Sequence, residues 1–111
     1  MEDNMYTVKI KNEYLHGPLW VYNEDGIPVW NPQLIQNDPI LKELNEKAEE
    51  MFSSYYEFDS HNLPCWFNKE QEIVDKDIMI DLIAKMISRL NEINDGSFII
   101  EDLETERLKS L

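Results

Sequence analysis

The segment from Asn68 to Gly96 carries the pattern that most constrains how this chain can fold. Its apolar residues are too numerous for a helix that buries a single narrow stripe. They are Ile78, Met79, Ile80, Leu82, Ile83, Met86, Ile87, Leu90 and Ile93. We expect a helix that begins near Asn68 or Asp75 and ends at Asn94-Asp95-Gly96, with Gly96 as its C-terminal cap. This helix should form the centre of the hydrophobic core.

A second amphipathic helix is predicted from Asp38 to about Tyr56. Asp38 is the expected N-cap, because its carboxylate can accept hydrogen bonds from free backbone N–H groups. Pro39 suits the first helical position, where no N–H is needed. Apolar residues recur at helical spacing on one side: Leu41, Leu44, Ala48, Met51, Phe52 and Tyr55. Acidic residues occupy the opposite side: Glu43, Glu46, Glu50 and Glu57.

The N-terminal part of the chain favours strands. Residues 6–11 alternate between apolar and polar side chains, which predicts a half-buried strand with Tyr6, Val8 and Ile10 inward. Residues 19–30 are typical of a hairpin around Asn23-Glu24-Asp25-Gly26, with Gly26 in the left-handed conformation.

The register of this hairpin separates two faces. The expected core side carries Leu19, Val21, Ile27 and Val29, and the other side carries Trp20, Tyr22, Pro28 and Trp30. Proline has no N–H to donate, so the strand containing Pro28 should lie at the edge of the sheet.

The remaining segments complete the predicted fold. Residues 57–68 are interpreted as a loop broken at Pro64, residues 97–100 as a short strand, and Asp102 as the start of a terminal helix. The predicted order is β-β-β-α-α-β-α. We therefore expect one α+β domain over residues 1–111, with a mainly antiparallel sheet and helices packed on one face.

The charge of the chain limits the partners that it can bind. Asp and Glu number 23 against 10 Lys and Arg, which gives a formal net charge of −13 over 111 residues. Such a charge keeps a protein soluble or attracts a positively charged partner, and it repels the phosphates of nucleic acids and anionic lipids. We therefore expect a basic protein partner, with no direct binding to nucleic acid or membrane.

A cytoplasmic location is expected from three features of the sequence. The single cysteine, Cys65, excludes an internal disulfide. The acidic segment Met1–Asn4 lacks the hydrophobic stretch of a signal peptide. No apolar run is long enough to span a bilayer.

Residues 57–65 contain the few groups that could perform chemistry. Asp59, His61 and Cys65 leave open a small enzyme or enzyme subunit, although a lone cysteine is more often a buried structural residue. Glu57, Asp59 and His61 could hold a metal, but their spacing matches no zinc or calcium pattern. We predict no catalytic residue, no metal ligand and no cofactor.

The glutamate side of the helix that begins at Asp38 favours a binding surface. Solubilising faces usually interleave both signs of charge, whereas only Lys42 and Lys47 flank these glutamates. The predicted partner-binding residues are Glu43, Glu46, Glu50, Glu57, Asp59, Trp20, Tyr22 and Trp30. Two alternatives to a binding surface remain open. The glutamates could form an ordinary solvated helix face, and a helix could cover the aromatic face that contains Trp20 and Trp30.

The general character of the chain suggests a function. A small, acidic, cysteine-poor chain with segments such as 20–26 (WVYNEDG) and 55–59 (YYEFD) resembles the immunity proteins that bacteria make against their own nuclease-type toxins, of which the barstar-like inhibitors are an example. The resemblance implies a non-enzymatic toxin inhibitor, and it carries over no site residue. We also expect a monomer or weak dimer. The alternatives are a phage-encoded nucleic-acid mimic, the small enzyme mentioned above, and an adaptor that oligomerises through Trp20 and Trp30.

Overall fold

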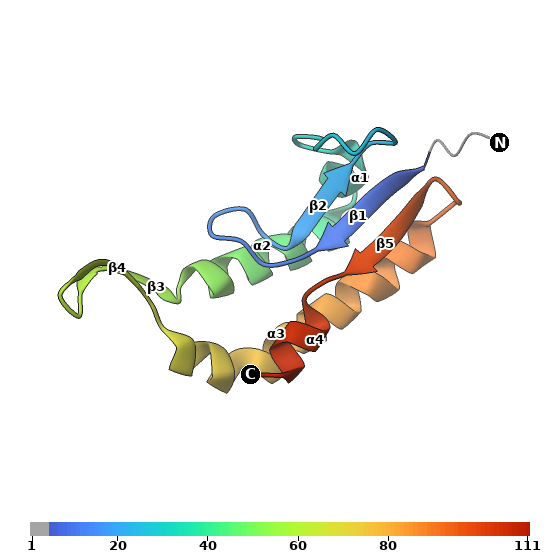
Figure 1. The fold of residues 1–111 in the computed structure, drawn as a ribbon. Coiled ribbons are helices and arrows are strands. Elements are labelled where there is room, and N and C mark those ends of the chain that lie inside the picture. Colours follow the sequence, from blue (N-terminus) through green and yellow to red (C-terminus); the bar gives the residue numbers. More distant parts are fainter. Residues whose placement is uncertain (1–4) are drawn as a thin grey trace.

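The computed structural model describes residues 5–111, in which two long helices cover one face of a three-stranded sheet (Figure 1). The segment Met1–Asn4, for which we expected no signal peptide, lies outside the described residues. The elements are β1 (Tyr6–Ile10), β2 (Leu19–Tyr22), α1 (Gln33–Gln36), α2 (Pro39–Ser53), β3 (Tyr56–Ser60), β4 (Leu63–Phe67), α3 (Lys69–Ile93), β5 (Phe98–Asp102) and α4 (Thr105–Lys109). None of the helices within residues 5–111 is both long and apolar enough to cross a membrane.

The main sheet has the strand order β2-β1-β5. Strand β1 pairs antiparallel with β2, with Val8 opposite Val21, and parallel with β5, with Val8 opposite Ile100. Strands β3 and β4 form a separate antiparallel hairpin. Within residues 5–111, two of the three strand pairings are therefore antiparallel, and the predicted α+β class is confirmed.

The core lies between the sheet and helices α2 and α3. The inward residues of the sheet are Val8, Ile10, Leu19, Val21 and Phe98, all of them buried. Tyr6 was expected to point inward as well, but it is exposed. It occupies the first position of β1, next to the segment Met1–Met5 that precedes the strand.

Helix α2 begins as the sequence predicts. One carboxylate oxygen of Asp38 accepts hydrogen bonds from the N–H groups of Ile40 and Leu41, at 3.1 and 3.0 Å. The predicted apolar stripe is wholly or partly buried. The helix ends at Ser53 instead of Tyr56, because the chain turns at this point into β3.

Helix α3 begins and ends close to its predicted positions, and Asn68 caps its start by accepting a hydrogen bond from the N–H of Gln71 at 3.0 Å. The predicted C-terminal cap is wrong: Asn94, in an extended conformation, is the C-cap, and Gly96 follows two residues later with a φ of 95°. The chain leaves the helix before the glycine, because the Asn94 side chain accepts a hydrogen bond from the N–H of Gly96 in a turn. The fully buried apolar residues of α3 form one stripe: Met79, Ile83, Met86 and Leu90. The flanking Ile80, Leu82, Ile87 and Ile93 are partly buried, whereas Ile78 is exposed, so burial on more than one side is only partial.

The order of elements differs from the predicted one in the segment after β2. The turn itself is confirmed: Gly26 has a φ of 77°, and the N–H of Asn23 donates to the carbonyl of Ile27 at 2.9 Å. Residues 27–30, however, form only a single bridge, between Tyr22 and Pro28, and Ile27 is exposed instead of core. The chain leaves the sheet because Asn31 adopts a φ of 49° and leads into the short helix α1.

The predicted loop over residues 57–68 is wrong, since this segment forms the β3–β4 hairpin. Tyr56 pairs with Phe67, and His61 and Asn62 make the turn with φ values of 54° and 57°. The hairpin extends beyond the sheet at one end of the molecule (Figure 1). Aromatic packing attaches it to α2 and to the turn after it, with the Phe67 ring centroid 5.6 Å from that of Phe52 on α2 and 5.9 Å from that of Tyr55 in the turn.

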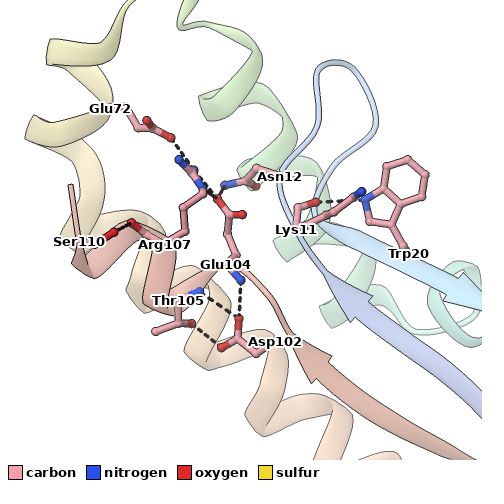
Figure 2. Close-up of polar contacts among 9 residues, drawn as sticks. All are labelled: Lys11, Asn12, Trp20, Glu72, Asp102, Glu104, Thr105, Arg107 and Ser110. Carbon is pink, nitrogen blue, oxygen red and sulfur yellow. Dashed lines mark hydrogen bonds and ion pairs between the residues drawn. The ribbon is translucent and has the colours of Figure 1, made fainter.

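A buried ionic cluster joins α4 to the rest of the fold (Figure 2). Arg107 donates hydrogen bonds to Glu72 on α3, at 2.6 Å, and to Glu104. Asn12, which follows β1, donates to the same Glu104 at 3.1 Å. Asp102 was expected to begin the terminal helix, but it is the last residue of β5. Its carboxylate accepts hydrogen bonds from the N–H groups of Glu104 and Thr105, at the start of α4. This cluster fixes the C-terminal segment against α3 and the sheet.

Candidate functional site

A groove with a volume of about 250 Å³ runs beside β2, between residues 28–32, helix α1 and the middle of α2. Two of the predicted aromatic residues, Trp20 and Trp30, and one predicted glutamate, Glu46, line it together. These residues come from three separate segments of the chain. The groove is therefore the place where the predicted aromatic and acidic surfaces meet.

One wall of the groove is a flank of α2. Lys42, Asn45, Glu46 and Glu49 line it at spacings of three, four and seven residues, which place them on one side of a helix. Glu46 and Glu49, together with Glu50, also line an adjoining hollow. Glu49 was missed from the sequence, although its position three residues after Glu46 is the signal that could have found it.

Close packing of the segment between β1 and β2 holds this wall against the sheet. The side-chain oxygen of Asn45 accepts a hydrogen bond from the N–H of Leu19 at 3.0 Å. Gly17 has a φ of 89°, and a Cβ there would lie 2.8 Å from the amide of Asn45. Only glycine fits both the left-handed conformation and this close approach. The start of β2, and with it Trp20, is thus fixed beside α2.

The aromatic residues of the predicted site have different surroundings. The half-buried Trp20 stacks on His16 with ring centroids 3.5 Å apart, and its indole N–H donates to the carbonyl of Lys11 at 3.0 Å (Figure 2). The ammonium of Lys11 lies 5.4 Å from the Trp20 ring, and that of Lys9 lies 5.0 Å from the Tyr22 ring. Two of the three rings therefore already have a cationic neighbour within the chain.

Trp30 supplies the accessible aromatic surface of the groove. It is 76% exposed, so the alternative that a helix covers this residue is wrong. Its nearest aromatic neighbour is His16, with ring centroids 6.4 Å apart in an edge-on arrangement. The large flat ring thus remains open to a ligand at one side of the groove.

The other predicted acidic residues lie outside the groove. Glu43 is exposed on α2 and pairs with Lys47 at 3.2 Å. Glu57, expected on the helix, lies on β3, where it accepts a hydrogen bond from the Ser60 hydroxyl at 3.2 Å. Asp59 is exposed near the end of the same hairpin. The structure therefore joins Glu46 and Glu50 into one acidic ridge and places Glu57 and Asp59 elsewhere.

The residues considered for catalysis do not converge. His61 stacks on Trp66, with ring centroids 3.7 Å apart, whereas Cys65 pairs with Phe58 across the hairpin. Successive residues of a strand point to opposite faces, so Cys65 faces away from Trp66 and the His61 ring. Cys65 is also exposed, in contrast to the buried position expected for a structural cysteine. Within residues 5–111, no group of three or more His, Cys, Asp and Glu side chains could hold a metal ion.

Comparisons with known proteins identify no relative. No protein-family model matches the chain, and no significant match was found among curated proteins or solved structures.

Proposed function

We propose that this protein is a non-enzymatic, acidic binding protein of the cytoplasm that neutralises a basic protein partner. The candidate partner is a bacterial toxin of the nuclease type, for which this chain would be the immunity protein. The observation that carries the proposal is the groove, where Glu46 and Glu49 line one wall and the exposed Trp30 another.

The proposed mechanism is substitution of phosphate by carboxylate. A nuclease binds the backbone of its substrate through Lys and Arg side chains. Carboxylates held on a rigid helix such as α2 can pair with the same cations and block them. The net charge of −13 would accelerate the encounter with a basic partner, and desolvation of an aromatic residue in the interface would slow dissociation.

The same charge bears on other partners. Nucleic acids and anionic membranes would be repelled, and self-association would be opposed, so we propose that the protein acts as a monomer or weak dimer.

A charge-reversal experiment tests this function. The full-length protein is first used to isolate and identify its partner from cells that produce it. The variant Glu46→Lys/Glu49→Lys should then bind that partner about 100-fold more weakly, because reversal replaces two attractive pairs with repulsive ones. Titration calorimetry or surface plasmon resonance measures the affinity.

A matched variant separates the groove from the overall charge. Asp77→Lys/Glu92→Lys makes the same change in net charge at two exposed positions of α3. It should alter the affinity less than about fivefold, through long-range attraction alone. Equal losses in the two variants would refute the groove as the binding surface, and an acidic partner would refute the function itself.

A further inference from the structure

The groove combines two features that recognise one kind of cation. Glu46 and Glu49 contribute two carboxylates, against the single ammonium of Lys42. In residues 5–111 neither glutamate has an ion pair within 4.0 Å, so both remain available to a ligand. Trp30 contributes an exposed aromatic face, and cations bind to such faces through the negative potential of the ring.

The chain itself indicates that its aromatic rings attract cations. Lys11 lies over Trp20 and Lys9 lies over Tyr22, at 5.4 and 5.0 Å from the ring centroids. Trp30 is the exception among the three predicted aromatic residues, because no lysine or arginine of the described part of the chain lies over its ring. In Trp20 and Tyr22 the face of the ring is occupied by a lysine of the same chain, whereas in Trp30 this face remains open.

An arginine fits this combination better than a lysine. The guanidinium is planar and weakly hydrated, so it stacks on a flat ring, and its fork of N–H groups can pair with a carboxylate through two hydrogen bonds. An ammonium is compact and strongly hydrated, and it loses more on entering a partly enclosed groove.

We infer that the groove receives an arginine side chain of the partner, with its guanidinium stacked on Trp30 and paired with Glu46 or Glu49. This inference rests on the proposed function, since it names the group by which the basic partner would be recognised. It makes Trp30 an anchor of the interface, whereas Trp20 holds His16 and the wall of the groove in place.

The test uses methylguanidinium chloride as a probe of the full-length protein. The indole N–H signals of Trp20, Trp30 and Trp66 are followed by nitrogen-15 NMR at constant ionic strength, with methylammonium chloride as the matched competitor. We expect a saturable shift of the Trp30 signal, an unmoved Trp66 signal, and affinity for methylguanidinium at least about threefold higher than for methylammonium.

Variants locate the site. Glu46→Gln/Glu49→Gln should weaken methylguanidinium binding at least about fivefold, because it removes both carboxylates. Trp30→Ala should also weaken methylguanidinium binding at least about fivefold, because it removes the aromatic face. This variant should fold normally, since the Trp30 ring is exposed. The control Asp77→Asn/Glu92→Gln removes two charges from exposed positions of α3 and should leave the affinity unchanged.

Three results would overturn the inference: no saturable shift at Trp30, equal affinity for the two probes, or no effect of Glu46→Gln/Glu49→Gln. The proposed function would survive each of them if charge reversal of the groove still weakened the natural partner. Conversely, methylguanidinium binding without any effect of charge reversal on the partner would refute the groove as the partner-binding surface, and with it the assignment of the arginine to the partner.

Discussion

Replacement of Arg107 by alanine is expected to lower the free energy of unfolding by about 3 kcal/mol, the low end of the range for breaking a buried ion pair. Glu72 and Glu104 are each only 3% exposed, and Arg107 is the cation that they share. Burial alone would lower the pKa of Arg107, but its hydrogen bonds to Glu104 and Glu72 outweigh burial and raise that pKa. Without Arg107, two buried carboxylates would lose their counter-charge. The side chain of Arg107 is 41% exposed, so in the variant water can hydrogen-bond to part of the two carboxylates, which is why we expect the low end of the range.

Two further variants separate this effect from general damage to α4. Compared with Arg107→Ala, the double variant Arg107→Ala/Glu72→Gln should regain at least about 1 kcal/mol of unfolding free energy, because it removes one of the two buried carboxylates left without a counter-charge. Lys109→Ala breaks the pair between Lys109 and Glu106 on the same helix, which is exposed, and should change stability by less than about 0.5 kcal/mol. Urea unfolding followed by circular dichroism measures all three. A loss below about 1 kcal/mol for Arg107→Ala would show that the cluster is not a major source of stability.

Replacement of Asp38 by alanine is expected to cost about 2 kcal/mol, since it removes an N-cap and a charge-assisted hydrogen bond. The same carboxylate caps α2 and accepts hydrogen bonds from Arg89 on α3, with N–O distances of 2.7 and 2.9 Å. It therefore fixes the start of the helix that carries Glu46 and Glu49. Asp38→Asn should lose less, because asparagine caps helices as well as aspartate does and only the ion pair is weakened.

The cost of Asp38→Ala should also depend on pH. The hydrogen bond from Arg89 is the largest influence on Asp38, and it lowers the pKa of this carboxyl below its usual value of 3.8. A group with a lowered pKa stabilises the fold fully above its unfolded value and loses that contribution as the pH falls through its folded value. The difference in unfolding free energy between wild type and Asp38→Ala should thus be constant from about pH 5 to 7 and should shrink below about pH 3.8. A difference that stays the same at about pH 3 would exclude the ionised carboxylate as its source.

The helix boundaries that could be predicted are those with local signals. Asp38 with Pro39 at the start of α2, and Asn68 at the start of α3, act on N–H groups within a few residues, so the sequence contains the whole cause. The β3–β4 hairpin has no such signal. Its turn uses His61 and Asn62 in the left-handed conformation instead of glycine, and its second strand contains Pro64, a residue that is unfavourable in strands. The aromatic contacts that hold it join residues of α2 to residues of β4.

The members of the candidate site could be predicted better than their arrangement. Residue type and helical spacing predicted Trp20, Trp30 and Glu46 as candidate binding residues, and their proximity in the groove depends on tertiary packing. In particular, the contact of Gly17 with Asn45 brings the segment before β2 against α2. Nothing in the local sequence specifies that contact.

The charge of the partner and the salt dependence of its association test the central claim most directly. The account predicts a partner of net positive charge whose association rate constant falls at least about tenfold between about 50 and 500 mM NaCl, because the anionic surface accelerates the encounter. The dissociation rate constant should change much less over the same range. Stopped-flow measurements of both constants provide the answer. A neutral or acidic partner, or an association rate that does not respond to salt, would contradict the claim that the surplus carboxylates serve to bind a cationic protein.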